Sequence, residues 1–330
     1  MTPLAWPDLV AEALRRRKAE GLTQRNHAAL AGVSIPTMAA FERGETTLTL
    51  AKAFDILRVV GLLDERPPED AQDRFVREAM ARWRDLTADL PKESPARFPH
   101  GWYRFDYELV GDLENVTISS LRNTIEKGNF SDSIMPILNI NSLFGFKNIE
   151  NDEYIEVFLN PKYFEKINEN VYNLLVPEFG RVSSRGNAIF IRAYSEDLQN
   201  QFAPRRIFDT TEPIRKISKT ILQARDFSRI ISCNHFEEII IKFRALYSGL
   251  YGRVLKDWTN PIAGLSLEGH PASSDEVTIQ VNIPVNEVPS LIAEHVHPLV
   301  VSLYERFGER GPSLQSVKAE VAQVLSRRAL

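Results

Sequence analysis

The sequence predicts a small all-α N-terminal domain followed by a larger α/β or α+β domain with a central sheet. A length of 330 residues exceeds what one hydrophobic core usually serves. Apolar residues recur at helical spacing near the N-terminus, and from about residue 102 they alternate as they do in strands. We therefore expect a first domain at 1–65, a connector helix and linker at 66–101, and a second domain at 102–330.

Residues 8–64 are expected to form four short helices joined by brief turns. Gly21 fits the end of the first helix, while Thr23 and Ser34 stand where the second and third helices need N-caps. Pro36 fits the first helical turn, where its missing N–H costs little. The segment TLTLAKAFDILRVVGLL has apolar residues at helical spacing and predicts the fourth helix.

The segment DERPPED at 64–70 interrupts this pattern and marks a boundary. After it, AQDRFVREAMARWRDLTADL places apolar residues along one side of a connector helix. This helix either packs on its own protomer or pairs with its copy in a dimer, and its seam is too short to favour a coiled coil. Residues 91–101 follow as a linker or an irregular entry into the second domain.

Strand-like and helix-like segments are interspersed after residue 102. The expected strands are YRFDYELVG, EYIEVFL, AIFIRAY, EEIIIKFRALY and VTIQVNIPV. The expected helices are PKYFEKINENVYNLLVPEF, PIRKISKTILQARDF, VPSLIAEHVHPLVVSLYERFG and SLQSVKAEVAQVLSRRAL. Residues 112–174 hold 11 asparagines, a shift in composition whose role the sequence leaves open.

The stretch LTQRNHAALAGVSIPTMAAFERG resembles the lambda-repressor-like (Xre-type) helix-turn-helix family. The resemblance covers roughly residues 8–64 and implies a helix-turn-helix domain that binds double-stranded DNA. His27 departs from the family pattern, which usually has a large aliphatic residue there, and we expect a core or rim side chain rather than a ligand. The matching residues are Leu22-Thr23-Gln24, Ala28, Leu30, Gly32-Val33-Ser34, Met38, Phe41-Glu42 and Gly44.

The resemblance also implies roles for individual residues. Arg17 and Glu42 would form a partly buried pair that joins the first helix to the third. Gln24 would donate to a DNA phosphate from the start of its helix, and Arg25 and Arg43 would add positive charge. The positions that face the major groove would be Ser34, Ile35, Pro36, Thr37 and Ala40.

Three of these five groove-facing residues lack a hydrogen-bonding side chain, and none can make a bidentate contact to a base. Ile35, Pro36 and Ala40 can contact thymine methyl groups, so we expect recognition of T-rich steps and of DNA bending. The competing interpretation is a domain that has lost DNA binding and docks a protein, and the retained Gln24, Arg25 and Arg43 argue against it.

The net charge of −4 excludes a generally basic surface, so DNA binding must depend on a local patch. Between residues 15 and 43 the chain carries six positive residues and only two negative ones. Such a run is usually a solvated helix face, and only its position in the first domain favours a role with DNA. The residues are Arg15, Arg16, Arg17, Lys18, Arg25 and Arg43 against Glu20 and Glu42.

The second domain shows no catalytic signature, since it contains no GxGxxG, P-loop, HExxH or CxxC motif. Cys233 is the single cysteine, which excludes an internal disulfide and an all-cysteine metal site. His295 and His297 lie two residues apart, as do Cys233 and His235, and neither pair suffices for a metal. We expect no enzymatic activity, no cofactor and no metal.

Cations inside strands and flanked by aromatic residues can line a pocket for an anionic or nucleotide-like ligand. More often they are edge or rim residues with solvated heads. The residues that would line such an effector pocket are Trp102, Arg104, Arg192, Lys242, Arg244 and Tyr247.

Together these features predict a sequence-specific transcription regulator, a repressor that binds a palindromic operator as a homodimer. The second domain would dimerise and sense a small-molecule or protein effector. The alternative is an antitoxin-like or defence-associated protein whose large domain binds a partner or carries an unrecognised activity. With no signal-peptide pattern and no apolar run near the ~20 residues that span a bilayer, we expect a cytoplasmic protein without a membrane partner.

Overall fold

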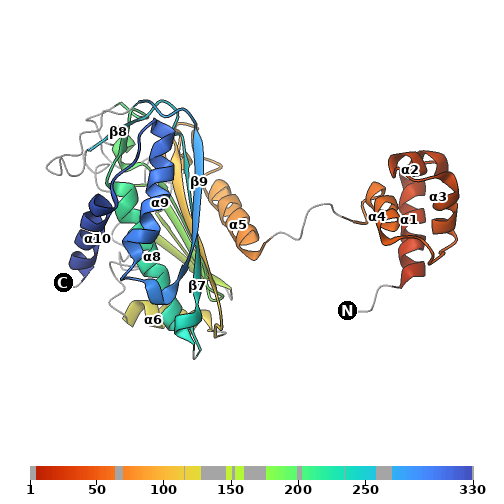
Figure 1. Cartoon of the computed structure of the whole chain (residues 1–330), viewed down its shortest axis with the longest axis horizontal. Helices are drawn as coiled ribbons and strands as arrows, with labels where there is room; N and C mark the ends of the chain where they lie inside the picture. Colours follow the sequence, from red (N-terminus) through yellow and green to blue (C-terminus); the bar gives the residue numbers. More distant parts are fainter. Residues whose placement is uncertain are drawn as a thin grey trace. The chain divides into compact units, whose positions relative to one another are not determined.

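The computed structural model divides the chain into two compact units, residues 1–70 and 71–330 (Figure 1). The residues that the structure describes are 5–63, 70–114, 116–127, 146–150, 153–159, 176–198, 203–233, 235–257 and 270–328.

The first unit contains four short helices around one small core, which confirms the predicted all-α domain. Met38 and Phe41 are fully buried at its centre, and the Trp6 ring meets Phe41 edge-on at 5.5 Å between ring centroids. Trp6 also donates its indole N–H to the carbonyl of Gly44 at 3.0 Å, which ties the start of the chain to the end of the third helix. The helices are α1 Trp6–Ala19, α2 Gln24–Leu30, α3 Ile35–Glu42 and α4 Leu50–Val59.

The second and third helices begin at the residues that the sequence marks as caps. The Thr23 hydroxyl accepts the N–H of Asn26 at 3.1 Å, and the Ser34 hydroxyl accepts the N–H of Thr37 at 3.3 Å. Gly32, with φ at +63°, ends α2 in a left-handed conformation that a side chain would strain. Local sequence thus fixes the turn between α2 and α3.

The second unit is built on a seven-stranded sheet in which every pairing is antiparallel. An antiparallel sheet with helices on its faces is the α+β alternative of the two predicted classes. A separate pair of short parallel strands, β6 Ile207–Asp209 and β8 Val254–Lys256, stands apart from it. In spatial order the sheet runs β2 Phe146–Glu150, β3 Tyr154–Leu159, β4 Glu178–Ser183, β5 Asn187–Ala193, β1 Trp102–Val110, β7 Ile240–Ser248 and β9 Glu276–Pro284.

Two strands of this sheet, β2 and β4, differ from the sequence-based expectation. The expected helix at 161–179 overlaps the start of β4, and most of that helix lies outside the described residues. Gly180 and Arg181 interrupt the apolar pattern of β4, so the sequence pattern does not predict a strand there. Most of the asparagine-rich region at 112–174 also lies outside the described residues.

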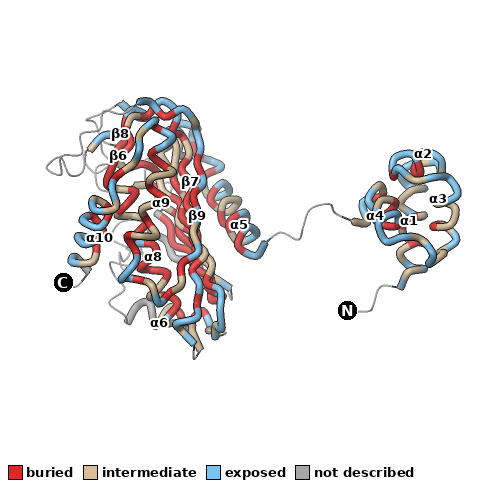
Figure 2. The backbone as a smooth tube through the Cα atoms, viewed as in Figure 1, coloured by how far each residue is buried: buried red, intermediate tan, exposed pale blue. Residues whose placement is uncertain are grey.

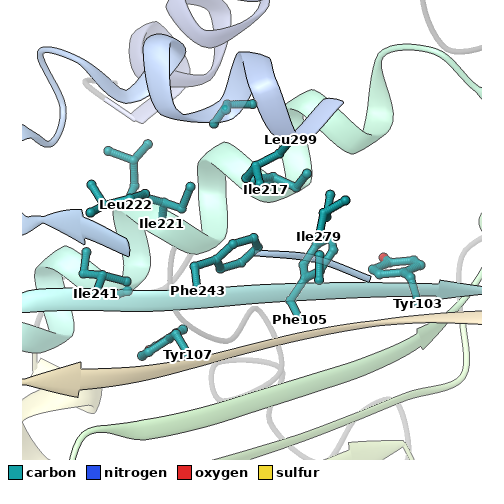
Figure 3. Packing of buried hydrophobic residues seen from close by; sticks show 14 of the residues in the cluster. Tyr103, Phe105, Tyr107, Ile217, Ile221, Leu222, Ile241, Phe243, Ile279 and Leu299 are labelled. Carbon is teal, nitrogen blue, oxygen red and sulfur yellow. The ribbon is translucent and has the colours of Figure 1, made fainter. Parts of the chain in front are cut away.

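One face of the sheet carries the main hydrophobic core. Tyr103, Phe105 and Phe243 point from the central strands towards Ile217 of α8 and Leu299 of α9 (Figure 3). Buried positions therefore concentrate between the sheet and these helices (Figure 2). Besides α5, the helices that the structure describes in this unit are α6 Ile118–Lys127, α8 Glu212–Ile231, α9 Ile292–Tyr304 and α10 Leu314–Arg328, with short 3-10 turns at Pro95–Arg97, Ser195–Leu198, Phe236–Glu238, Val285–Glu287 and Glu305–Phe307.

The opposite face of the sheet is partly covered by helix α5, Ala71–Leu86, which is the expected connector. Its buried Trp83 lies 5.7 Å from Phe179 of β4 between ring centroids, in a cluster that includes Ile189 and Ile191 of β5. The helix therefore packs on its own protomer. The larger unit begins with α5 rather than at residue 102, because the sheet would otherwise expose this apolar face.

Beside this cluster, the carboxylate of Asp106 in β1 has no exposed surface. Its Oδ2 accepts the side-chain N–H of Gln72 at 2.8 Å and the Nε–H of Arg244 at 2.7 Å. Arg104 Nε lies 2.8 Å from Oδ1, and Arg244 also donates to Asp73 at 2.5 Å. One buried charge thus joins β1, β7 and α5.

We expect Asp106→Ala to lower the free energy of unfolding of the larger unit by about 3–5 kcal/mol, because it removes one partner of a buried charge network and leaves Arg104 uncompensated. Urea unfolding followed by tryptophan fluorescence measures this loss. Asp73→Ala is the control, because the Asp73 side chain is 53% exposed and its removal should cost about 1 kcal/mol or less. Equal losses for the two variants would contradict the assignment.

Candidate nucleic-acid interface

The first turn of α3 is presented to solvent. Ser34, Ile35 and Pro36 are exposed, and Ile35 keeps 49% of its surface accessible although it is apolar. The hydroxyls of Ser34 and Thr37 lie 2.8 Å apart, so each already has a partner within the turn. Ala40, one turn further along, is half-buried. This surface offers methyl groups and two hydroxyls but no long polar side chain.

The pair expected from the resemblance, Arg17 and Glu42, is formed in the structure. Arg17 Nη1 lies 2.8 Å from one oxygen of Glu42, and both side chains are largely buried. Gln24 donates its amide N–H to the other oxygen of Glu42 at 2.9 Å. The side chain of Gln24 is thus held against α3. One of its two amide N–H groups bonds Glu42, and the second can donate to a further acceptor.

The basic run at the end of α1 is used mostly within the unit. Arg15 and Arg16 both donate to Glu12 and hold the pKa of its carboxyl well below its usual range, at about 2. Arg16 also donates to the carbonyl of Gly61 at 2.9 Å, just beyond the end of α4. These two arginines therefore support the fold, which the charge count of the sequence could not reveal.

Arg43 is paired as well, since its Nη2 lies 2.7 Å from the carboxylate of Glu45 on the surface. Within the described part of the chain, the side chains of Lys18 and Arg25 have no ion pair or hydrogen bond. Of the six cations that the sequence places in this patch, these two are the ones available to a phosphate without breaking a contact.

His27 is a core residue, as the sequence suggests. It is buried, and its Nε2 lies 2.9 Å from the carbonyl oxygen of Ile56 in α4. Because a carbonyl only accepts, Nε2 carries the proton in this bond. His27 thus replaces an aliphatic contact of the core with a hydrogen bond between α2 and α4.

Residues 14–64 match the family model described as Helix-turn-helix, and the match spans all of α2, α3 and α4. The N-terminal domain is a helix-turn-helix domain of the Xre and lambda-repressor-like type. Domains of this type are DNA-binding modules of transcription regulators. Neither a curated protein nor a solved structure matches the chain.

Outside the helix-turn-helix domain, the structure does not gather the six residues expected to line an effector pocket. Arg104 and Arg244 are bound to Asp106 beneath α5, and Lys242 donates to Glu108 at 3.1 Å. Because they lie on the sheet face that carries α5, they cannot share a pocket with residues of the opposite face. Trp102 packs beside Phe98, with 6.5 Å between their ring centroids.

Arg192 and Tyr247 lie on the face of the sheet opposite α5. Arg192 Nε lies 3.3 Å from the carboxylate of Glu178. Tyr247 lines a small cavity of about 10 Å³ together with Tyr103, Glu196 and Lys216, which is room for one water molecule. The cavity is too small for a nucleotide-like ligand.

The charges at this cavity are satisfied internally. Burial raises the pKa of Glu196. Burial opposes the charge of Lys216, but Tyr103 and Glu212 outweigh it and raise the pKa of that ammonium, whose Nζ lies 3.0 Å from Glu212. These groups are paired or hydrogen-bonded as parts of the fold. Their arrangement resembles a stabilised buried cluster more than a binding site.

The described residues form neither a metal-ligand cluster nor a membrane-spanning helix. No group of three or more histidine, cysteine, aspartate or glutamate side chains converges as a metal ligand set in the described ranges. None of the helices that the structure describes is long and apolar enough to cross a membrane. His295 and His297 have separate partners, Glu287 at 2.6 Å and the carbonyl of Pro312 at 3.1 Å.

We expect Glu42→Ala to destabilise the helix-turn-helix domain by about 2 kcal/mol. The change leaves the largely buried guanidinium of Arg17 without its carboxylate partner and removes the acceptor of the Gln24 amide. Hydrogen exchange of the α1 and α3 amides in the full chain measures this opening free energy. The matched control is Glu45→Ala, which breaks the exposed pair with Arg43 and should cost about 0–1 kcal/mol. A loss no greater than the control would contradict the role of Glu42.

Proposed function

We propose that this protein is a sequence-specific transcription regulator that places the first turn of α3 in the major groove of double-stranded DNA. The observation that carries the proposal is the exposed turn Ser34-Ile35-Pro36 on a matched helix-turn-helix domain. In this fold the recognition helix enters the groove with its N-terminal residues, while the preceding helix lies along the backbone. The exposure of this turn and its capped, rigid start fit that geometry.

The apolar character of the turn favours a particular kind of site. Ile35 and Pro36 can contact thymine methyl groups but cannot read the hydrogen-bonding edges of a guanine or an adenine. The hydroxyls of Ser34 and Thr37 can turn from each other towards DNA, at the cost of the bond that they now share. Specificity then depends on thymine methyls and on how readily the DNA bends.

Backbone contacts come from few charges. Arg25, at the start of α2, and Lys18 are available, while Arg43 must exchange Glu45 for a phosphate. Gln24 can offer its second amide N–H without leaving Glu42. With so few phosphate contacts, the affinity should fall only gently with salt, because the salt dependence counts the phosphates neutralised.

A single domain of this size makes too few contacts for useful specificity, which favours two domains on a palindromic operator. A dimer seated over a promoter would exclude polymerase, so we expect repression. We assign dimerisation rather than effector sensing to the larger unit, since the four cations expected to line a pocket are ion-paired with Asp106, Glu108 and Glu178.

We expect Ile35→Ala to reduce the preference for the selected site over random duplex by about thirtyfold, because the dimer loses one apolar contact of ~1 kcal/mol in each of its two half-sites. Fluorescence anisotropy with fragments selected from the gene's own upstream region measures both affinities. Non-specific affinity should not change. If the unaltered protein prefers no upstream sequence over random duplex, the proposed function fails.

We expect Arg25→Ala to weaken binding to all duplexes alike and to reduce the slope of log affinity against log salt by about 1 per domain, because one phosphate contact is lost. The same anisotropy titrations at several salt concentrations give the slope. Arg58→Ala in α4 serves as the control, since it removes an exposed arginine that is paired with Asp55. An unchanged slope for Arg25→Ala would show that this side chain does not contact DNA.

A further inference from the structure

Strand β9 forms one edge of the seven-stranded sheet. It pairs with β7 over nine consecutive residue pairs, from Ile240 opposite Pro284 to Ser248 opposite Glu276, without a bulge. No strand among the described residues pairs with its other side. A long, regular row of backbone groups is therefore left at this edge.

The parity of the ladder shows which backbone groups are free. Beyond the two ends of β9, Val285 donates to Ile239 and Asp275 accepts from Leu250, so odd-numbered residues bond towards β7. Alternation in an antiparallel pair then directs the N–H and C=O groups of the even-numbered residues outward. These residues are Thr278, Gln280 and Asn282, whose side chains are exposed.

This edge lacks the features that usually protect an edge strand. Between Glu276 and Pro284 the sequence is VTIQVNI, with no charge, no proline and no glycine. The opposite edge strand, β2, is only five residues long and includes Lys147 and Glu150. This contrast favours pairing of the β9 edge with a strand of another chain.

We propose that two copies of this chain pair through their β9 edges, antiparallel about a two-fold axis at Gln280. The axis stands perpendicular to the sheet, so the helix-covered face of one copy continues into the helix-covered face of the other. Two seven-stranded sheets would then form one continuous sheet. The inference deepens the proposed function and rests on it, because a palindromic operator needs a two-fold dimer.

The strand is self-complementary in this register. On the exposed face Thr278 meets Asn282 of the other copy, and Gln280 meets its own counterpart, so neutral hydrogen-bonding side chains lie opposite each other. On the helix-covered face Val277 meets Ile283 and Ile279 meets Val281, which extends the apolar core across the axis. No like charges face each other, since Glu276 lies opposite Pro284.

The first experiment is sedimentation equilibrium of the full chain without DNA. The unaltered protein should be dimeric at micromolar concentration, and Gln280→Pro should be monomeric. Proline is tolerated on an edge strand whose N–H faces outward, so the fold should persist, but its ring blocks pairing. Gln280→Thr is the matched control and should remain dimeric, and far-UV circular dichroism checks that both variants fold.

A second experiment tests the register with charges. Thr278→Lys combined with Asn282→Lys places two pairs of lysines opposite each other across the interface and should weaken the dimer by about tenfold. Thr278→Lys combined with Asn282→Glu makes two opposite-charge pairs and should not weaken it.

The proposal would be overturned by a monomeric unaltered chain, by a Gln280→Pro variant that dimerises normally, or by equal dimer affinities of the two double variants. A monomer that still selects an operator would leave the proposed function standing, whereas a β9 dimer that prefers no upstream DNA would remove that function alone.

Discussion

The buried carboxylate of Asp106 is the interaction on which the larger unit depends. It lies on strand β1, which also supplies Arg104, while the neighbouring strand β7 supplies Arg244 and helix α5 supplies Gln72. A charge without solvent is stable only where such partners hold it, so the position and register of α5 are fixed together with those of β7. The apolar contacts of Trp83 then close this face of the sheet.

A similar internal use of charge shapes the helix-turn-helix domain. Glu42 binds Arg17 and Gln24, and Glu12 binds Arg15 and Arg16, so most polar groups near the recognition helix have partners inside the domain. Under the proposed function, the surface that this domain turns towards DNA is mainly the apolar turn at Ile35 and Pro36. With few free charges, such a surface would discriminate DNA shape more than it would attract DNA by charge.

The proposed function and the proposed pairing of β9 share a requirement of symmetry. Recognition of a palindrome would need two domains related by a two-fold axis, and pairing through the β9 edge of the larger unit would supply one. Of the residues expected to line an effector pocket, Arg104 and Arg244 are ion-paired beneath α5, and Tyr247 borders a cavity of only about 10 Å³.

The sequence by itself determined the features that depend on neighbouring residues. The four helices of the first domain and their caps at Thr23 and Ser34 follow from short-range spacing, while the resemblance to the helix-turn-helix family implied the Arg17–Glu42 pair. Strands β1, β5, β7 and β9 were also predictable, because alternation of apolar residues is local. Only the tertiary structure decided that α5 belongs to the larger unit, that β4 exists, and that Arg104, Lys242 and Arg244 are ion-paired instead of lining a pocket. The charges that form these ion pairs are present in the segments RFDYE and IKFRA. The sequence could not show that they pair, because Asp106 and Arg244 are 138 positions apart and only the register of β1 against β7 brings them together.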